Sequence, residues 1–333
     1  MQNQKLPNVA QSKYVLLNER KSMKPLVSII TPSYNSSNYL DTFFVSIMNQ
    51  DYSNYEIIFI NDGSTDDTKS KALMYKKKFE NAGKRFVYLE QANGGQAKAM
   101  NLGFPYIEGK YFIWPDSDDE LYPNNISEKV DYMESHPNIA LVMSKADYTD
   151  EEGNILNCLE RHQKKHDDFF SDLLISQNVV FCPGIYMVRV SSFFKWVPDG
   201  KIFESRIGQN YQILLPIVYN EKWGYINKSL YRYILHQNSH SNKGKNNYNA
   251  QISRFYNHQN TLNILINMIC NEEDIEKYNK IIYSHFNKLY LRIAYKFGYS
   301  DDVKKYYKLL LDSKSNDFKD NIYYLTRGIK KRM

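Results

Sequence analysis

Residues 26–68 read LVSIITPSYNSSNYLDTFFVSIMNQDYSNYEIIFINDGSTDDT, and this stretch predicts a strand, a helix and a second strand. The runs 26–31 and 56–61 are almost continuously apolar, which is typical of strands covered on both faces in a parallel sheet. Between them, apolar residues recur at the spacing of one buried helix face: Leu40, Phe43, Phe44, Ile47 and Met48. The stretch therefore predicts a β-α-β unit with parallel strands.

The same alternation continues along the chain to residue 143. Apolar runs at 85–90, 111–115 and 139–143 predict further strands. Ser64 with Asp67 forms a capping-box pattern that predicts the start of a helix. From residue 252 onward the apolar spacing is helical. These patterns predict an α/β protein with a doubly wound, mainly parallel sheet and a C-terminal helical appendage.

Each predicted strand ends in polar or glycine-rich residues. These segments are TPSYN (31–35), NDGSTDD (61–67), EQANGGQAKAMNLG (90–103) and PDSDD (115–119). Each has an ordinary explanation as a turn, but ligands of doubly wound sheets bind beyond the carboxyl ends of the strands. Like charges as close as those from Asp116 to Glu120 repel each other. This acidic run is therefore either a solvated turn or a binding site for a divalent cation.

The composition is that of a soluble globular protein, with 42% hydrophobic and 24% charged residues. The N-terminus lacks the apolar core of a signal peptide, and no apolar stretch approaches the roughly 20 residues that cross a bilayer. The three cysteines are far apart, which excludes a disulfide framework and a zinc cluster and favours a reducing, intracellular location. Residues 251–333 hold 15 Lys+Arg and 9 Asp+Glu, a difference of +6 that equals the whole net charge. Such a tail can serve anionic lipid, nucleic acid or simply solubility, and solubility is the commoner explanation for so modest an excess.

Three pieces of the sequence, in order, resemble the family 2 glycosyltransferases, nucleotide-sugar enzymes with the GT-A fold. They are the stretch from 27 to 68, NGGQAKAMNLG (93–103) and YFIWPDSDDELYP (111–123). The resemblance is close over 25–145 and looser over 180–240. It implies a GT-A domain (25–240), and the N-terminal extension (1–24) and the helical C-terminal region (241–333) fall outside it. Within the GT-A domain, 25–145 would be the nucleotide-sugar half and 146–240 the acceptor half.

The resemblance assigns the acidic run to a divalent metal ion. Asp116 and Asp118 match the family's D-x-D, which holds Mn²⁺ or Mg²⁺ against the two phosphates of the donor, and hard oxygen ligands suit these cations. Asp118 is the expected direct ligand, and Asp116 is expected to face ribose or a metal-bound water. His240 is a candidate third ligand, whereas Asp119 could simply support the loop.

For the nucleotide, the resemblance implies that Tyr34 stacks on the base and that Asp62 accepts a hydrogen bond from it. Glycine in the NGG segment lets the backbone approach the ligand closely. Lys98, where the family often carries Arg, would reach the diphosphate or the base, or would be an ordinary surface lysine. The full set of expected nucleotide-sugar contacts is Thr31, Pro32, Tyr34, Asn35, Asp62, Gly63, Asn93, Gly94, Lys98, Asp116 and Ser117.

The catalytic base is where the sequence departs from the family. Inverting members need a base that takes the proton of the acceptor hydroxyl, and many carry it in an acidic pair that opens a helix. Here Gln209-Asn210 stands at that place, and an amide cannot accept this proton. Glu204 could supply the base instead, the acceptor could need no strong base, or the protein could bind its donor without turnover. Glu204 is the choice we favour, with Asn210 marking the family's position.

The leading functional hypothesis is an inverting, metal-dependent hexosyl- or N-acetylhexosaminyl-transferase. It would move a sugar from a UDP-sugar to a glycan or lipid-linked acceptor in the synthesis of a cell-surface polysaccharide or glycoconjugate, in the cytoplasm or at the inner face of the membrane. One alternative is a catalytically degenerate nucleotide-sugar-binding scaffold, which the amide at position 210 supports. A sugar-phosphate nucleotidylyltransferase is less favoured, because TPSYNSSNYL has neither the glycine nor the basic residue of those enzymes' first loop. No nucleic-acid partner is expected.

Overall fold

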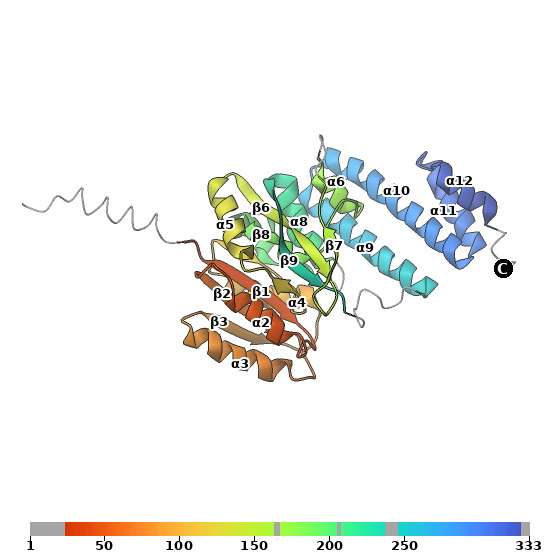
Figure 1. Ribbon diagram of the computed structural model, residues 1–333. Helices are drawn as coiled ribbons and strands as arrows, with labels where there is room; N and C mark the ends of the chain where they lie inside the picture. Colours follow the sequence, from red (N-terminus) through yellow and green to blue (C-terminus); the bar gives the residue numbers. More distant parts are fainter. Residues whose placement is uncertain (1–23, 163–166, 205–207, 237–245, 328–333) are drawn as a thin grey trace, which may run out of the picture.

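A computed structural model of the chain describes residues 24–162, 167–204, 208–236 and 246–327 (Figure 1). The opening stretch forms β1 (Val27–Ser33), α2 (Leu40–Met48) and β2 (Tyr55–Asn61). The two strands pair in parallel and every one of their residues is buried. Helix α2 buries the expected apolar face except Met48, which is 42% exposed, so the predicted stripe was one residue too long.

One sheet runs through the molecule in the order β3-β2-β1-β4-β8-β6-β9-β5, with β7 beside β6. Strands β1 to β4 pair in parallel, as do β6 and β9, which confirms the predicted mainly parallel sheet. Strands β5, β7 and β8 join in antiparallel pairs that the sequence did not predict. The remaining strand bounds are β3 (Phe86–Glu90), β4 (Tyr111–Ile113), β5 (Glu120–Leu121), β6 (Ile139–Thr149), β7 (Ile155–Leu159), β8 (Tyr186–Arg189) and β9 (Lys222–Ile234).

Helices cover both faces of the sheet because neighbouring strand residues point to opposite sides. Phe59 of β2 packs against Phe44 of α2 (ring centroids 5.5 Å apart), on the side that α2 and α3 (Thr68–Asn81) cover. Its neighbour Ile60 points to the other side, against α4 (Gln96–Gly103), where a Cβ on Gly103 would lie 2.9 Å from the Ile60 side chain. The arrangement is therefore doubly wound.

The capping box expected at Ser64 and Asp67 is wrong. Helix α3 begins at Thr68, and the Asp67 side chain makes no cap hydrogen bond. The Ser64 hydroxyl instead accepts from the backbone N–H of Asn35 (2.9 Å), so it ties two loops together. The other helices of this part are α5 (Asn125–Ser135), α6 (Phe169–Leu174), α7 (Val190–Trp196) and α8 (Gln209–Asn220), with 3₁₀ turns at Phe104–Tyr106, Pro183–Ile185 and Pro198–Gly200.

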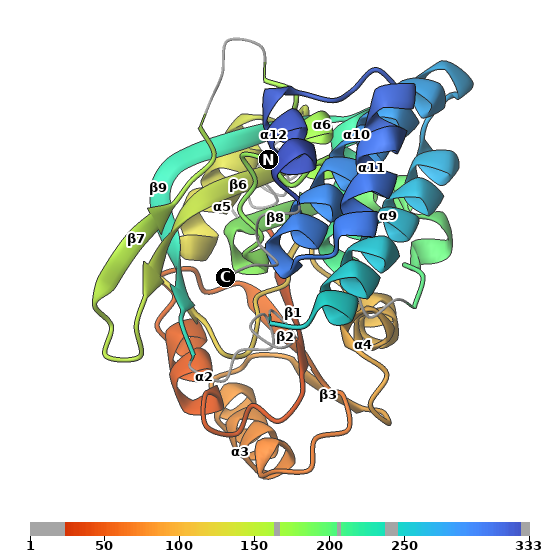
Figure 2. The ribbon, with the colours of Figure 1, turned by 90° about the vertical axis from the view of Figure 1, so that its right-hand side faces the viewer.

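Four helices follow the sheet and pack beside it (Figure 2). They are α9 (Tyr248–Ile269), α10 (Glu272–Phe297), α11 (Ser300–Asp312) and α12 (Phe318–Thr326). Leu262 and Ile266 of α9 and Phe286 of α10 are buried in the same apolar core as the sheet residues. The boundary at residue 240 therefore stays a proposal, although the predicted helical C-terminal region is confirmed. No helix among the described residues is long and apolar enough to span a bilayer.

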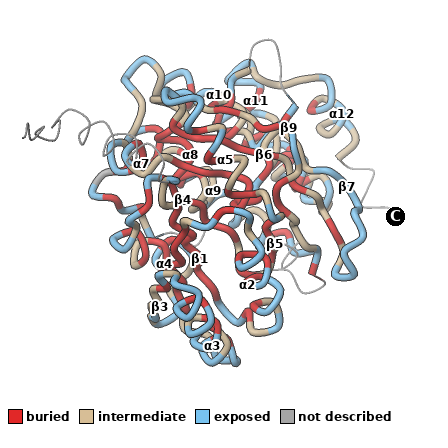
Figure 3. The backbone as a smooth tube through the Cα atoms, turned by 60° about the vertical axis from the view of Figure 1, so that its left-hand side comes forward, coloured by how far each residue is buried: buried red, intermediate tan, exposed pale blue. Residues whose placement is uncertain are grey.

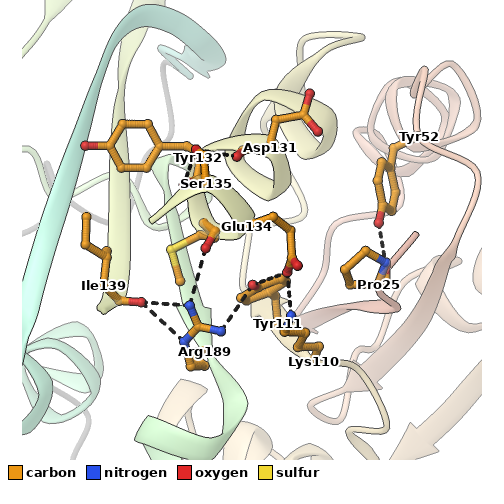
Figure 4. A network of polar contacts seen from close by, with 11 residues as sticks. Pro25, Tyr52, Lys110, Tyr111, Asp131, Tyr132, Glu134, Ser135, Ile139 and Arg189 are labelled. Atoms are coloured by element: carbon orange, nitrogen blue, oxygen red, sulfur yellow. Dashed lines mark hydrogen bonds and ion pairs between the residues drawn. The ribbon is translucent and has the colours of Figure 1, made fainter. Parts of the chain in front are cut away.

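Burial is concentrated on the central strands, β6 included, whereas β7 and the outward faces of the helices are exposed (Figure 3). At the amino end of β4, a polar network fastens the sheet (Figure 4). Tyr111 donates to the Glu134 carboxylate and accepts from Arg189 (3.2 Å), and Arg189 also donates to the carbonyl of Ile139 (3.0 Å). The network lies at the amino end of β4. The polar segment that follows the carboxyl end of β4 therefore lies at the opposite edge of the sheet.

Candidate active site

The polar segments that follow β1, β2, β3 and β4 are hydrogen-bonded to one another. The Ser117 hydroxyl donates to the Ser36 hydroxyl (2.9 Å), which joins the fourth segment to the first. The first is joined to the second through Asn35, whose side-chain oxygen accepts from the N–H of Thr65 (2.8 Å). The second and third are joined through Asp62. The polar segments after these four strands thus form one hydrogen-bonded surface at the carboxyl edge of the sheet.

Of the four residues expected near the nucleotide base, two are exposed and two are buried. The Tyr34 ring is 41% exposed and open to a ligand. Asn35 is exposed and has a left-handed backbone (φ 51°), a conformation that Asn tolerates better than most residues. Thr31 and Pro32 lie inside β1, opposite Phe59 and Ile60 of β2, and are buried.

Asp62 has a structural task that sequence reasoning missed. Its carboxylate accepts from the backbone N–H groups of Gly94 and Gly95 (2.8 Å each) and from the Gln91 amide (2.7 Å). The backbone is close here, since a Cβ on Gly63 (φ +71°) would lie 2.6 Å from the nitrogen of Asn93. Asp62 therefore holds the NGG loop at the start of α4.

This contact set gives a first testable expectation. Asp62→Asn should lower the free energy of unfolding by about 1–3 kcal/mol, because one accepting oxygen of this buried side chain becomes a donor that faces N–H groups. Chemical denaturation measures this change. Asp67→Asn is the matched control, since Asp67 is exposed and caps nothing. Equal stability of the two variants would contradict the structural role of Asp62.

Lys98 and Asn101 of α4 have different surroundings. Lys98 is exposed, and its side chain lies across Gly94, where a Cβ would be 2.4 Å from the Lys98 Cδ. Asn101 pairs with the backbone of Ile202, donating to its carbonyl (2.6 Å) and accepting from its N–H (2.9 Å). Asn101 therefore positions the segment that leads to Glu204.

The acidic run after β4 forms a compact cluster. Carboxylate oxygens of Asp116, Asp118 and Asp119 lie within 4.8 Å of one another. Asp116 accepts from the Gln96 amide at the start of α4 (3.2 Å), so the cluster borders the NGG loop. Asp119 is buried and accepts from the N–H of Ile234 in β9 (2.9 Å). Asp119 thus supports the loop, in addition to lying beside the other two acids.

The electrostatics of this cluster favour a cation. Burial, together with the charge of Asp118, raises the pKa of Asp116 to about 7. Burial also raises the pKa of Asp119, with the other two carboxylates adding to the effect. A divalent cation would relieve this repulsion, and three hard oxygen ligands match the chemistry that Mg²⁺ and Mn²⁺ require. The residues present therefore fit such an ion.

Two histidines follow β9 in the sequence, and one of them, His240, is the candidate third metal ligand. His240 lies outside the described residues. His236 is 7% exposed, and its ring nitrogens lie 3.0 Å from a Glu151 carboxylate oxygen and 3.0 Å from the carbonyl oxygen of Asp118. His236 therefore supports the backbone of the acidic run.

Tyr231 of β9 is a site residue that the sequence gave no sign of. Its hydroxyl donates to the Asp119 carboxylate (3.0 Å) and accepts from the N–H of Asp116 (3.2 Å). Its ring lies on Gly184, where a Cβ would come within 1.9 Å of it. The Gly184 carbonyl accepts from the amine of Lys129 (2.7 Å), whose pKa is lowered to about 7 by burial. These residues are distant in sequence, so only the fold brings them to the cluster.

The start of α8, where the family carries its catalytic base, borders the acidic cluster. Helix α8 begins at Gln209, whose amide donates to Gln96, and Gln96 in turn contacts Asp116. The Asn210 side-chain oxygen accepts from the indole N–H of Trp114 (2.9 Å). Glu204 is exposed and follows Phe203, which is fixed by Gln212 of α8 (2.7 Å). Both candidate positions are thus anchored to elements that line the site.

The profile of glycosyl transferase family 2 matches residues 28–197, which is half of the chain. This chain belongs to glycosyltransferase family 2. It is 38% identical over 141 residues to an uncharacterized glycosyltransferase of Rickettsia prowazekii, a match covering 42% of each chain. It is 36% identical over 110 residues to TuaG of Bacillus subtilis, a putative teichuronic acid biosynthesis glycosyltransferase, covering 33% of this chain and 42% of TuaG. The chain thus spans about two fifths of the length of these relatives.

Solved structures share the fold over nearly the whole chain. TarS of S. aureus, solved in complex with UDP-GlcNAc, has a TM-score of 0.61 at 16% identity, covering 93% of this chain and 92% of that one. The mannosyltransferase PcManGT of Pyrobaculum calidifontis, solved with GDP-Man and Mn²⁺, has a TM-score of 0.55 at 13% identity, covering 97% and 88%. At these identities the likeness establishes the GT-A-type fold.

Proposed function

We propose that this chain is an inverting glycosyltransferase that moves a sugar from a UDP-sugar to a hydroxyl of a glycan or lipid-linked acceptor. The observation that carries the proposal is the cluster of Asp116, Asp118 and Asp119, joined through Gln96 and Ser117 to the loops after β1 and β3. Family membership and the UDP-GlcNAc bound to TarS support a nucleotide-sugar donor. The similarity to TuaG supports a role in the synthesis of a cell-surface polymer.

The donor would lie along the carboxyl edge of the sheet. Its base would stack on the exposed Tyr34 ring, between the loops that Asn35 and Asp62 tie together. Its diphosphate would lie between the start of α4 and the acidic cluster, where backbone N–H groups and Lys98 favour negative charge. Asn93, Gly94 and Ser117 are the remaining contacts in this arrangement.

Asp118 and Asp116 are the residues that we propose to hold Mn²⁺ or Mg²⁺, with His240 a third candidate. The ion would neutralise the charge that develops on the leaving diphosphate. The Mn²⁺ in PcManGT supports a divalent ion in this fold. Tyr231 would hold the backbone of Asp116 in place, and Gln96 would hold its carboxylate.

Glu204 is our proposed base. The acceptor hydroxyl would give its proton to the Glu204 carboxylate while its oxygen attacks the anomeric carbon. The bond from that carbon to the diphosphate oxygen breaks in the same step, so UDP leaves and the configuration inverts. The support for this assignment is that the backbone of Ile202 and Phe203 is held by Asn101 and Gln212, which places the following residue beside α4 and α8.

One observation favours a second candidate, a donor-binding scaffold without turnover: position 210 carries an amide, and that amide is engaged by Trp114. Release of UDP from UDP-glucose, UDP-galactose and their N-acetyl forms, with and without glycan acceptors, tests the two against each other. The transferase predicts release that one donor and one acceptor accelerate together. The scaffold predicts donor binding without release under any combination.

A further inference from the structure

Helix α12 turns its apolar face outward. Phe318, Ile322 and Leu325 are four and then three residues apart, so they lie on one side of the helix. Their side chains are 77%, 41% and 73% exposed. Apolar residues at this spacing normally face a core, and here they form a stripe toward solvent, which we call the α12 stripe.

The inner face of α12 is fixed by polar and aromatic contacts. Asp320 is fully buried, and the Lys288 amine lies 3.8 Å from it and 2.9 Å from Asp317. The Tyr324 ring stacks on Tyr307, with centroids 4.2 Å apart. These contacts, together with the capping box of Asp317 and Asp320, determine which side of α12 faces the helices α10 and α11. Because these contacts fix the inner face of α12, its apolar stripe faces outward.

Exposed lysines lie on α12 and in the turn that precedes it. The described residues 313–327 carry three basic residues, Lys314, Lys319 and Arg327, and two acids. Both acids, Asp317 and Asp320, already contact Lys288. The exposed Lys319 lies on α12 itself, and the exposed Lys314 lies in the turn before it. An apolar stripe with cations beside it matches an anionic lipid surface, where the apolar side chains enter the headgroup boundary and the cations meet the lipid charge.

We propose that the α12 stripe docks this protein on an anionic lipid surface. A second copy of the chain is a poorer partner, because a two-fold contact would bring the same cations face to face. The proposal does not depend on the donor or acceptor of the proposed reaction. If the acceptor is lipid-linked, docking would hold the enzyme at the surface that carries it.

Co-sedimentation of the full chain with vesicles tests this. Phosphatidylcholine vesicles with about 30% phosphatidylserine should bind the protein, and pure phosphatidylcholine vesicles should not. Binding should weaken as salt rises, because surface charge is screened. Lys314→Gln and Lys319→Gln should each weaken it by about fivefold, the factor for one cation near such a surface. Phe318→Asp with Leu325→Asp should abolish it, with the fold checked by circular dichroism.

Met268→Asp is the matched control, because Met268 is 57% exposed but lies on α9. It should bind vesicles as the unchanged protein does. The proposal is wrong if binding ignores phosphatidylserine, or if the Phe318/Leu325 variant binds normally. It is also wrong if the protein forms a dimer that the Phe318/Leu325 variant dissociates, since a second copy would then cover the stripe.

Discussion

Asp118→Ala is expected to lower turnover by at least about a thousandfold while leaving the protein as stable as before. A metal ion supplies several kcal/mol of stabilisation to a charged transition state, and about 4 kcal/mol corresponds to a thousandfold in rate. The stability expectation follows from the crowding of the cluster, because Asp118 raises the pKa values of Asp116 and Asp119. Removing its charge relieves that repulsion. The His236 contact with the carbonyl of residue 118 is retained, since it involves the backbone.

The measurements are initial rates of UDP release and a thermal melt in chelator. EDTA should abolish activity of the unchanged protein, and Mn²⁺ or Mg²⁺ should restore it. Asp131→Ala is the control, because Asp131 is an exposed acid on α5, near the network at the amino end of β4 (Figure 4) and not in the cluster. Full activity in EDTA would contradict the metal assignment. A parallel loss of activity and melting temperature would make Asp118 a structural residue.

Glu204→Gln is expected to lower kcat by roughly 10²–10⁴-fold, the range for general acid–base catalysis, with donor affinity unchanged. The amide has almost the same size but cannot take the acceptor proton. Glu204 is exposed and glutamine has nearly its shape, so the replacement should not disturb packing. Single-turnover rates and donor titrations separate the two effects. Normal turnover would remove Glu204 from the mechanism.

Asn210→Asp in the Glu204→Gln background is the matching probe. The indole N–H of Trp114 would still donate to residue 210, and the start of α8 favours a carboxylate there. The variant should therefore fold and bind donor as before. Recovery of turnover would show that position 210 lies where a base can act, as in other members of the family.

The β1–α2–β2 unit could be predicted because its strands are buried on both faces and its helix shows a regular apolar stripe. Strands β5 and β8 could not be predicted, because two and four residues are too few to show a period. Their antiparallel pairing depends on contacts between residues distant in sequence, such as Tyr111 with Arg189. Met48 fits the helical spacing yet is exposed, because it is the last residue of α2 and lies at the margin of the buried face.

Within the site, sequence reasoning located the segments but not their internal support. Asp116 and Asp118 stand out because four acids follow an apolar run. Tyr231 and Gly184 do not stand out, because a tyrosine in a strand and a glycine after a proline are common. The close approach of the Tyr231 ring to Gly184 and its hydrogen bond to Asp119 exist only once β9 lies beside the turn at 183–185.

The most direct test of the central claim is calorimetric titration of the full chain with UDP-sugars in Mn²⁺ and in EDTA. We predict that at least one UDP-sugar binds in Mn²⁺, and that Asp118→Ala or EDTA weakens its binding by about tenfold or more, the loss expected when one phosphate–metal contact of more than about 1.4 kcal/mol disappears. Binding of no UDP-sugar in Mn²⁺, or equal binding in EDTA, would contradict a metal-dependent UDP-sugar site at the Asp116–Asp119 cluster.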